Sequence, residues 1–420
     1  MSFTELNLKQ ELTAAIAKWG YTTPTAIQKK TIPVSLQNKD IIGKSHTGTG
    51  KTAAFVLPIL HNLDIKLYRN QAIIVCPTRE LAIQVAKQVK KYAYFLDGVN
   101  VALLCGGANI RNQLYDLRTS NIVVGTPGRI TDHINRGSLR LNTIKTIVLD
   151  EADEMLKMGF KKDIDFLFEN SPTDIQTVLF SATMSKPVLK IADDYQNNPV
   201  SISVEDETSK LQQENISQFY FDCRNTNKET ALVALYQNIK PELSIVFSNT
   251  KAFTTRIAKV LSDNGIQSAV INGDKSQRER LDAMRQFKNG TVKVLIATDV
   301  VARGIDVNGI DYIFNYDIPR EHEYYTHRIG RTARAGAKGT AITLVSNRAQ
   351  YNELQDIQYY QKHDIKLFDS VDWELPKNIV LAPATTQRPS FLSRDRGDRG
   401  RNDFSRNNNG NSNWRKKDRY

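Results

Sequence analysis

The chain has 420 residues, more than a single hydrophobic core normally organises, so more than one domain is expected. It is 40% apolar and 24% charged, and no apolar run approaches the roughly 20 residues of a membrane-spanning helix, which excludes a helical membrane protein and predicts a soluble one without membrane contact. The formal net charge of +12 suggests a polyanionic partner, with nucleic acid the first candidate.

The cysteines and the N-terminus together predict a cytoplasmic location. The three cysteines lie far apart and form no C-x-x-C pair, which fits a reducing compartment and argues against structural zinc. The first residues, "MSFTELNLKQEL", lack a basic segment followed by an apolar one, so no signal peptide is expected.

Short β-branched apolar runs alternate with helical patterns, which predicts α/β domains with parallel sheets. In the first half, the expected strands are 40–43, 72–76, 101–105, 121–125, 146–150 and 177–181. In the second half, they are 244–248, 268–272, 292–299, 312–317 and 340–345. The polar stretch 203–217 between the two sets has no apolar period, so we interpret it as a linker between two domains.

The end of the chain is a low-complexity segment rich in Arg, Asn and Gly, which predicts disorder. From Thr386 to Tyr420 it carries ten Lys or Arg against four Asp, half of the total net charge. Aromatic residues are spaced among these basic ones, a combination typical of sequence-tolerant binding to single strands. We interpret the segment as an RNA tether; a solubilising tail is the alternative.

The stretch "SHTGTGKT", Ser45 to Thr52, follows the first expected strand and resembles a phosphate-binding loop, with serine in place of the leading glycine. Gly48 and Gly50 allow backbone N–H groups to turn around a phosphate, and a helix N-terminus follows. In this pattern Lys51 reaches the β- and γ-phosphates and the Thr52 hydroxyl ligates Mg²⁺. These residues predict a nucleotide-phosphate site; taken alone, an ordinary glycine turn is the alternative.

The strand 146–150 ends in Asp150, followed by Glu151. In a parallel sheet this carboxyl end lies beside the phosphate loop, where one carboxylate can hold Mg²⁺ and the next can orient and deprotonate a water molecule. The alternative is a solvated acidic turn that opens a helix.

The motifs occur in a fixed order that resembles the DEAD-box family of ATP-dependent RNA helicases. They are "GYTTPTAIQ" with Phe3 upstream, "TGTGKT", "PTRELA", "TPGR", "VLDEADEML", "FSAT", "VFSNT", "ATDVVARGID" and "HRIGRTARAG". The resemblance runs from Phe3 to Val345, and its first motif resembles the Q motif of this branch of helicases.

The resemblance implies two tandem RecA-like domains, each a parallel sheet flanked by helices, followed by a disordered basic tail. The implied boundaries are 1–204 for the ATP-binding domain (Q motif 1–29), 205–215 for the linker, 216–366 for the second helicase domain and 367–420 for the tail. Since neither domain holds both the phosphate loop and the arginines of the last motif, the complete site requires both.

The resemblance also assigns roles by position. It places ATP binding at Tyr21, Thr25, Gln28, Ser45, His46, Thr47, Gly48, Thr49, Gly50, Lys51, Thr52 and Asp306. Catalysis falls to Lys51, Asp150, Glu151, Arg331 and Arg334, the last two as arginine fingers, with Thr52 and Asp150 as metal ligands. Coupling of hydrolysis to RNA falls to Asp153, Ser181, Thr183 and His327.

RNA is the implied partner, held mainly through its backbone in single-stranded or short duplex form. The implied contacts are Pro77, Thr78, Arg79, Gly106, Gly107, Thr126, Gly128, Arg129, Asn249, Gly273, Gln277, Thr298, Asp299 and Arg303. Phosphate and 2′-OH contacts carry affinity but little sequence information, so the pathway stays open among ribosome assembly, mRNA turnover and cold adaptation. Ribosomal and RNA-decay proteins are candidate partners.

Two alternatives accompany this interpretation, and some positions depart from the commonest family form: Ser45, His46, Asn272, Val301 and Ala333. The alternatives are an ATP-gated RNA clamp with little unwinding and a DNA helicase. Ala333 stands where the family commonly has glycine. If that position has positive φ, its methyl group costs about 1 kcal/mol.

Overall fold

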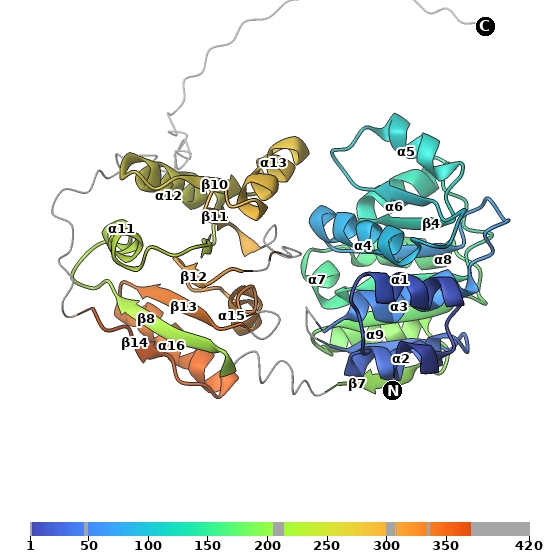
Figure 1. Cartoon of the computed structure of the whole chain (residues 1–420), viewed down its shortest axis with the longest axis horizontal. Helices are drawn as coiled ribbons and strands as arrows, with labels where there is room; N and C mark the ends of the chain where they lie inside the picture. The colour runs from blue at the N-terminus through green and yellow to red at the C-terminus, as the bar shows by residue number, and fades with distance from the viewer. Residues whose placement is uncertain are drawn as a thin grey trace, which may run out of the picture. The chain divides into compact units, whose positions relative to one another are not determined.

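The structure, a computed structural model, describes residues 2–45, 49–204, 214–299, 307, 309–333 and 337–370 (Figure 1). Most of the predicted linker and nearly all of the predicted basic tail lie outside these residues, and the proposed domain boundaries remain predictions. No helix in the described part of the chain is long and apolar enough to cross a membrane.

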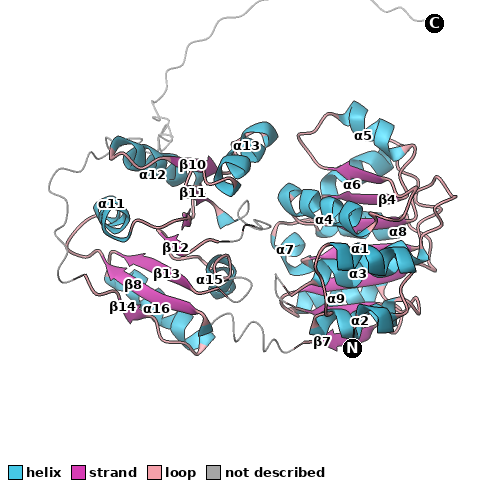
Figure 2. Cartoon of the chain, viewed as in Figure 1, coloured by secondary structure: helices cyan, strands magenta, loops and turns pink. Residues whose placement is uncertain are grey.

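The N-terminal sheet has seven parallel strands in the order β3-β4-β2-β5-β6-β1-β7. The strands are β1 (Ile41–Lys44), β2 (Ala72–Val75), β3 (Val101–Leu104), β4 (Ile122–Gly125), β5 (Thr146–Asp150), β6 (Gln176–Ser181) and β7 (Val200–Ser203). Helices pack around the sheet (Figure 2). They are η1 (Phe3–Leu6), α1 (Gln10–Lys18), α2 (Ala26–Ser35), α3 (Lys51–Asn62), α4 (Arg79–Tyr92), α5 (Ile110–Leu117), α6 (Pro127–Asn135), α7 (Ala152–Lys157), α8 (Lys161–Glu169) and α9 (Lys186–Tyr195).

The C-terminal sheet repeats this architecture with the order β10-β11-β9-β12-β13-β8-β14, again all parallel. The strands are β8 (Ile216–Asp222), β9 (Ser244–Phe247), β10 (Ser268–Ile271), β11 (Val294–Ala297), β12 (Tyr312–Asn315), β13 (Gly339–Val345) and β14 (Lys366–Leu367). Its described helices are α11 (Lys228–Ile239), α12 (Lys251–Asp263), α13 (Gln277–Lys288), α15 (His322–Ile329) and α16 (Arg348–Gln361). Counted along the chain, the seven strands of each sheet follow the same order, so the two lobes share one topology.

Both faces of each sheet pack against a hydrophobic core, and successive residues of a strand therefore point into two different cores. In β2, for example, Ile74 belongs to one cluster while Ile73 and Val75 belong to another. In β9, Ile245 and Val246 divide between two clusters in the same way. This explains why the strands are continuous apolar runs, and it leaves the strand ends as the places where polar side chains gather.

All eleven strands expected from the sequence are present within a few residues, so the predicted two-sheet α/β fold is confirmed. The sequence did not predict β7, β8 and β14. β7 and β14 are short outermost strands with exposed residues, and the apolar run of β8 is interrupted by polar residues, so none has the continuous apolar run that marks the other strands.

Candidate active site

The connection between β1 and α3 is the predicted phosphate loop. Gly50 caps α3 with φ of 92°, a left-handed conformation that glycine adopts without strain. Ser45 joins the start of the loop to β6, because its N–H donates to the carbonyl of Ser181 at 3.0 Å, and its hydroxyl lies 2.6 Å from that of Thr49. Lys51 is the first residue of α3, where unpaired N–H groups of the helix favour an anion.

The Gln28 side-chain amide is hydrogen-bonded to this loop. Its Oε1 accepts from the N–H of Thr25 at 3.0 Å and its Nε2 donates to the carbonyl of Gly50 at 3.0 Å. A Cβ at Gly50 would lie only 2.4 Å from Nε2, so glycine is required for this approach. Tyr21 lies nearby on the same segment, 40% exposed, and its hydroxyl accepts from Lys91 at 3.3 Å.

A buried lysine–carboxylate pair lies at the end of β5. The Nζ of Lys51 is 3.9 Å from Oδ1 of Asp150, and the residues are 6% and 3% exposed. Burial raises the pKa of Asp150, Lys51 opposes that shift, and the neighbouring Glu151 adds to it. Neither Nζ nor Oδ1 has a hydrogen-bond partner in the described part of the chain.

Unpartnered buried polar atoms are costly, and a charged ligand is one explanation for them. An ammonium group aimed at the space in front of a helix N-terminus suits phosphate oxygens. A single buried carboxylate beside it suits Mg²⁺, which is commonly held by one or two carboxylates together with the phosphates. The residues present therefore fit a Mg²⁺–nucleotide pair.

Glu151 follows Asp150 with a φ of 58°, a strained conformation for a residue other than glycine.

Asp153 connects this site to the residues after β6. Its Oδ2 accepts from both the N–H and the hydroxyl of Thr183 at 3.1 Å, and its Oδ1 accepts from the N–H of Glu154 at 3.1 Å. The Ser181 hydroxyl donates to the Thr183 carbonyl at 2.7 Å. The structure thus brings together three of the four residues predicted to couple hydrolysis to RNA.

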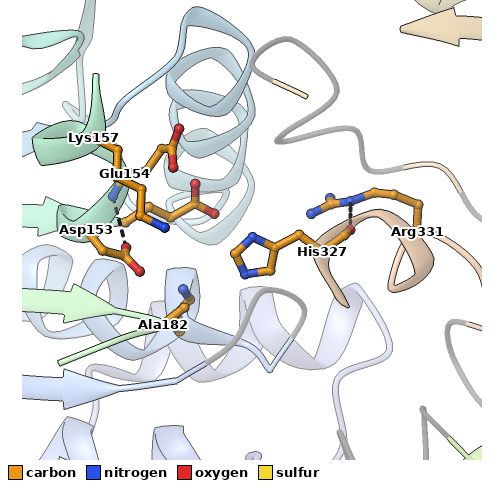
Figure 3. A pocket seen from close by; sticks show the side chains of 8 residues that line it. Asp153, Glu154, Lys157, Ala182, His327 and Arg331 are labelled. Carbon is orange, nitrogen blue, oxygen red and sulfur yellow. Dashed lines mark hydrogen bonds between the residues drawn. The ribbon is translucent and has the colours of Figure 1, made fainter. Parts of the chain in front are cut away.

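The fourth, His327, lies with Arg331 on the opposite wall of one pocket (Figure 3). The remaining lining residues are Lys51, Glu151, Asp153, Glu154, Lys157 and Ala182. Nε of Arg331 donates to the His327 carbonyl at 3.1 Å, which fixes the base of its guanidinium group. The pocket therefore joins the predicted loop lysine and carboxylates to one of the two predicted arginine fingers.

The predicted RNA contacts of the N-terminal lobe share the carboxyl edge of its sheet. Pro77, Thr78 and Arg79 follow β2, Gly106 and Gly107 follow β3, and Thr126, Gly128 and Arg129 follow β4. The Arg79 guanidinium packs on the glycine pair so closely that a Cβ at Gly107 would lie 2.4 Å from its Nη1. Gly107 also has φ of 76°, so this turn requires glycine for two reasons.

In the C-terminal lobe, two of the residues predicted to contact RNA, Asn249 and Asp299, are hydrogen-bonded to another protein side chain. Nη2 of Arg328 donates to Oδ1 of Asn249 at 2.8 Å, and Arg328 also binds both carboxylate oxygens of Asp299. In contrast, both amide atoms of Gln277 are shielded from solvent and have no hydrogen-bond partner among the described residues. The predicted contact of Gln277 with RNA stays a prediction. Gly273 and Thr298 also follow strands of this sheet.

Six predicted site residues lie outside the described residues: His46, Thr47, Gly48, Arg303, Asp306 and Arg334. Ala333, in contrast, is described and has φ of 53°, so the condition stated for its methyl group is met.

Comparison with known proteins identifies the family. Residues 25–191 match the DEAD/DEAH box helicase family and residues 227–336 match the helicase conserved C-terminal domain. The chain is 45% identical over 366 residues to the DEAD-box ATP-dependent RNA helicase CshA of Geobacillus kaustophilus, covering 87% of this chain and 78% of that protein. The chain belongs to the DEAD-box family of ATP-dependent RNA helicases.

Two further comparisons agree. The CshA helicase of Bacillus subtilis is 43% identical over 349 residues, or 83% of this chain and 70% of that protein. The structure of S. cerevisiae Dbp5 bound to RNA and ADP BeF3 matches with a TM-score of 0.80 and 34% identity, covering 87% of this chain and 95% of that one. The predicted tandem RecA-like fold, ATP binding, RNA binding and ATP-dependent RNA helicase activity are thereby confirmed.

Sequence reasoning about this DEAD-box helicase missed three contacts. The first is the set of hydrogen bonds from Arg328, which is 1% exposed, to Asn249 and Asp299. The position of Arg328 in the "HRIGR" motif was the sequence feature that could have indicated them. Arg280 pairs with Glu80 at 2.7 Å, across 200 positions of sequence, which no local pattern could reveal.

The third missed contact involves Lys157, whose Nζ lies 2.6 Å from Glu321 and 2.8 Å from Glu323. Burial of the ammonium group works against its charge, but the hydrogen bonds to these two carboxylates raise the pKa of Lys157 above its usual value.

Proposed function

We propose that this DEAD-box helicase hydrolyses Mg²⁺-bound ATP at the pocket lined by Lys51, Glu151 and Arg331, with Asp150 beside Lys51. The observation that carries the proposal is the buried Lys51–Asp150 pair, whose Nζ and Oδ1 atoms have no hydrogen-bond partner among the described residues. Thr52, the second residue of α3, supplies the hydroxyl expected beside a metal. Mg²⁺, when bound there, neutralises phosphate charge.

In this proposal Lys51 binds the β- and γ-phosphate oxygens, and Glu151 orients the attacking water and accepts its proton. General-base catalysis of this kind contributes about 10²–10⁴-fold. Arg331, together with Arg334, stabilises the charge that develops on the γ-phosphate, a contribution of about 10³–10⁵ for arginine fingers. Gln28 and Tyr21 contact the adenine, so ATP is preferred to GTP.

Asp153, Ser181, Thr183 and His327 transmit the state of the nucleotide to the RNA side. The hydrogen bonds between Asp153 and Thr183 support this role, because they join the segment after Glu151 to the segment after β6. Backbone contacts at the strand ends hold a single RNA strand without strong sequence preference, and short duplexes are separated locally. We further propose a cytoplasmic role in ribosome assembly, mRNA turnover or cold adaptation, with ribosomal or RNA-decay proteins as partners.

Phosphate release measured with RNA, with DNA and with no nucleic acid tests the proposal. We expect RNA to stimulate release well above the other two conditions, and Glu151→Gln to abolish the stimulation while ATP binding is retained. Equal rates in all three conditions would contradict the proposal. A parallel assay with a short labelled duplex separates helicase from clamp, since hydrolysis without strand separation would favour the clamp. In cells, crosslinking of the Glu151→Gln protein to RNA is expected to trap the physiological substrate.

A further inference from the structure

Gln113 is a buried residue of α5 to which the helicase motifs assign no role. It is 3% exposed, and its side-chain amide makes three hydrogen bonds, one to the turn after β3 and two to α6. Nε2 donates to the carbonyl of Cys105 at 2.9 Å. Oε1 accepts from Nη1 of Arg129 at 2.8 Å and lies 3.0 Å from Nε2 of His133. Both ends of the amide are therefore engaged.

The two partners of Oε1 belong to one face of α6. Arg129 and His133 are four residues apart on this helix, so their side chains lie one above the other. His133 is fully buried, and burial lowers its pKa, so the imidazole is neutral. Because Oε1 can only accept, the proton of the neutral ring is on Nε2, and Nδ1 lies 2.9 Å from the Ser138 hydroxyl. His133 thus donates to Gln113 and helps to fix its orientation.

The third hydrogen bond, to the Cys105 carbonyl, connects the Gln113 amide to the turn after β3 at the same edge of the sheet. Cys105 directly precedes Gly106 and Gly107, the turn on which the Arg79 guanidinium packs. One buried amide therefore links the turn after β3 with the arginine after β4. Nη1 of Arg129 is also near the Ala108 carbonyl, at 3.5 Å, whereas Nη2 has no hydrogen-bond acceptor in the described part of the chain.

We propose that Gln113 is a positioning residue for RNA binding, which holds the Arg129 guanidinium and the Gly106–Gly107 turn in one fixed relation. The inference rests on the proposed contact of Arg129 and this turn with RNA. A flexible arginine must lose rotamer freedom when it binds a phosphate, a cost that the existing hydrogen bond to Gln113 reduces in advance. Nη2 is left to meet a phosphate oxygen.

The experiment compares Gln113→Met, Arg129→Ala and the double variant in the full-length protein. The affinity for a fluorescein-labelled single-stranded oligouridylate is measured by anisotropy over a range of salt concentrations. We expect Gln113→Met to weaken RNA binding by about tenfold, the scale of one hydrogen bond to a charged group. It should also reduce the slope of log affinity against log salt by about 0.7, the value for one lost phosphate contact on a single strand.

The matched control is Gln71→Met. Gln71 is also 3% exposed, and its amide also makes three hydrogen bonds to nearby backbone, but it precedes β2 and so lies at the opposite end of the strands from the RNA contacts. We expect Gln71→Met to lower the unfolding midpoint as Gln113→Met does, with RNA affinity and salt slope unchanged. If both variants weaken RNA binding equally, the effect is general destabilisation and the inference is wrong.

The double variant separates the inference from the proposed function. We expect it to bind RNA no more weakly than Arg129→Ala, because Gln113 acts through Arg129. Additive losses would overturn the inference. If Arg129→Ala itself leaves RNA binding unchanged, the proposed contact of Arg129 fails, and the inference fails with it. If Gln113→Met does not fold, Gln113→Asn, which withdraws the amide by one methylene, is measured with the same expectations.

Discussion

Replacement of Gln28 by alanine separates the two roles of its amide, one within the protein and one toward the nucleotide. In the protein, Oε1 closes the capping box of α2 with Thr25, and Nε2 holds the Gly50 carbonyl, both at 3.0 Å. Because Nε2 has two hydrogens and Oε1 has two lone pairs, each atom can still make one hydrogen bond to an adenine edge. Gln28→Ala removes all four contacts.

The expected magnitudes follow from these contacts. Loss of two protein hydrogen bonds at about 1 kcal/mol each lowers the free energy of unfolding by about 2 kcal/mol. For a domain of this size that is a decrease of about 4–8 °C in the unfolding midpoint. Loss of the two adenine contacts should weaken ATP binding by a further 10–100-fold, roughly, and should remove the preference for ATP over GTP. Thermal unfolding and competition binding with the two nucleotides measure the two effects separately.

Glu279→Ala provides the control, because Glu279 closes an equivalent capping box on α13. Its Oε2 accepts from the N–H of Ser276 at 2.8 Å, and no nucleotide contact is proposed for it. We expect this variant to lose its helix cap and to keep both ATP affinity and base preference. If Gln28→Ala lowers the unfolding midpoint but leaves ATP affinity and base preference intact, the proposed adenine contact is wrong and the amide only stabilises the loop.

Two further predictions concern buried polar groups. Asp153→Ala removes the acceptor of both Thr183 hydrogen bonds, so RNA-stimulated phosphate release at saturating RNA should fall by about tenfold while ATP affinity changes little; an equal fall without RNA would speak against a coupling role. Burial, reinforced by Arg129 and opposed by Asp132, lowers the pKa of His133 below 6.5, so the folded state favours the neutral ring. The contribution of His133 to the free energy of unfolding is complete above pH 6.5 and is lost as the pH falls below that value. The free energy of unfolding, measured with urea between about pH 7 and pH 5, should therefore depend less on pH in His133→Gln than in the wild type.

The structural features that depend on local sequence pattern were predicted correctly. Each apolar run that was interpreted as a strand is a strand, and because parallel strands end at one edge, the motifs after them could be placed together from the sequence alone. The sequence could not predict contacts between distant segments. The bond from Gln28 to Gly50 and the pair of Glu80 with Arg280 depend on how separate elements pack, and Gln113 carries no local signal at all.

The repeated topology places a buried lysine at the same position in both lobes, with different surroundings. α3 follows β1 and α11 follows β8, which occupy the same place in the two sheets, and each helix begins with a buried lysine. In the C-terminal lobe, Lys228 donates to the Tyr316 carbonyl at 2.6 Å and lies 3.6 Å from Asp317, just after β12.

Lys51 has the corresponding place beside Asp150, at the end of β5, but its Nζ has no hydrogen-bond partner among the described residues. The Lys228 ammonium group is thus hydrogen-bonded within the fold, whereas the Lys51 ammonium group has its ion pair with Asp150 but no hydrogen-bond partner among the described residues. Since burial of a polar group without a hydrogen-bond partner opposes folding, this difference supports the proposal that the Lys51 ammonium group binds phosphate.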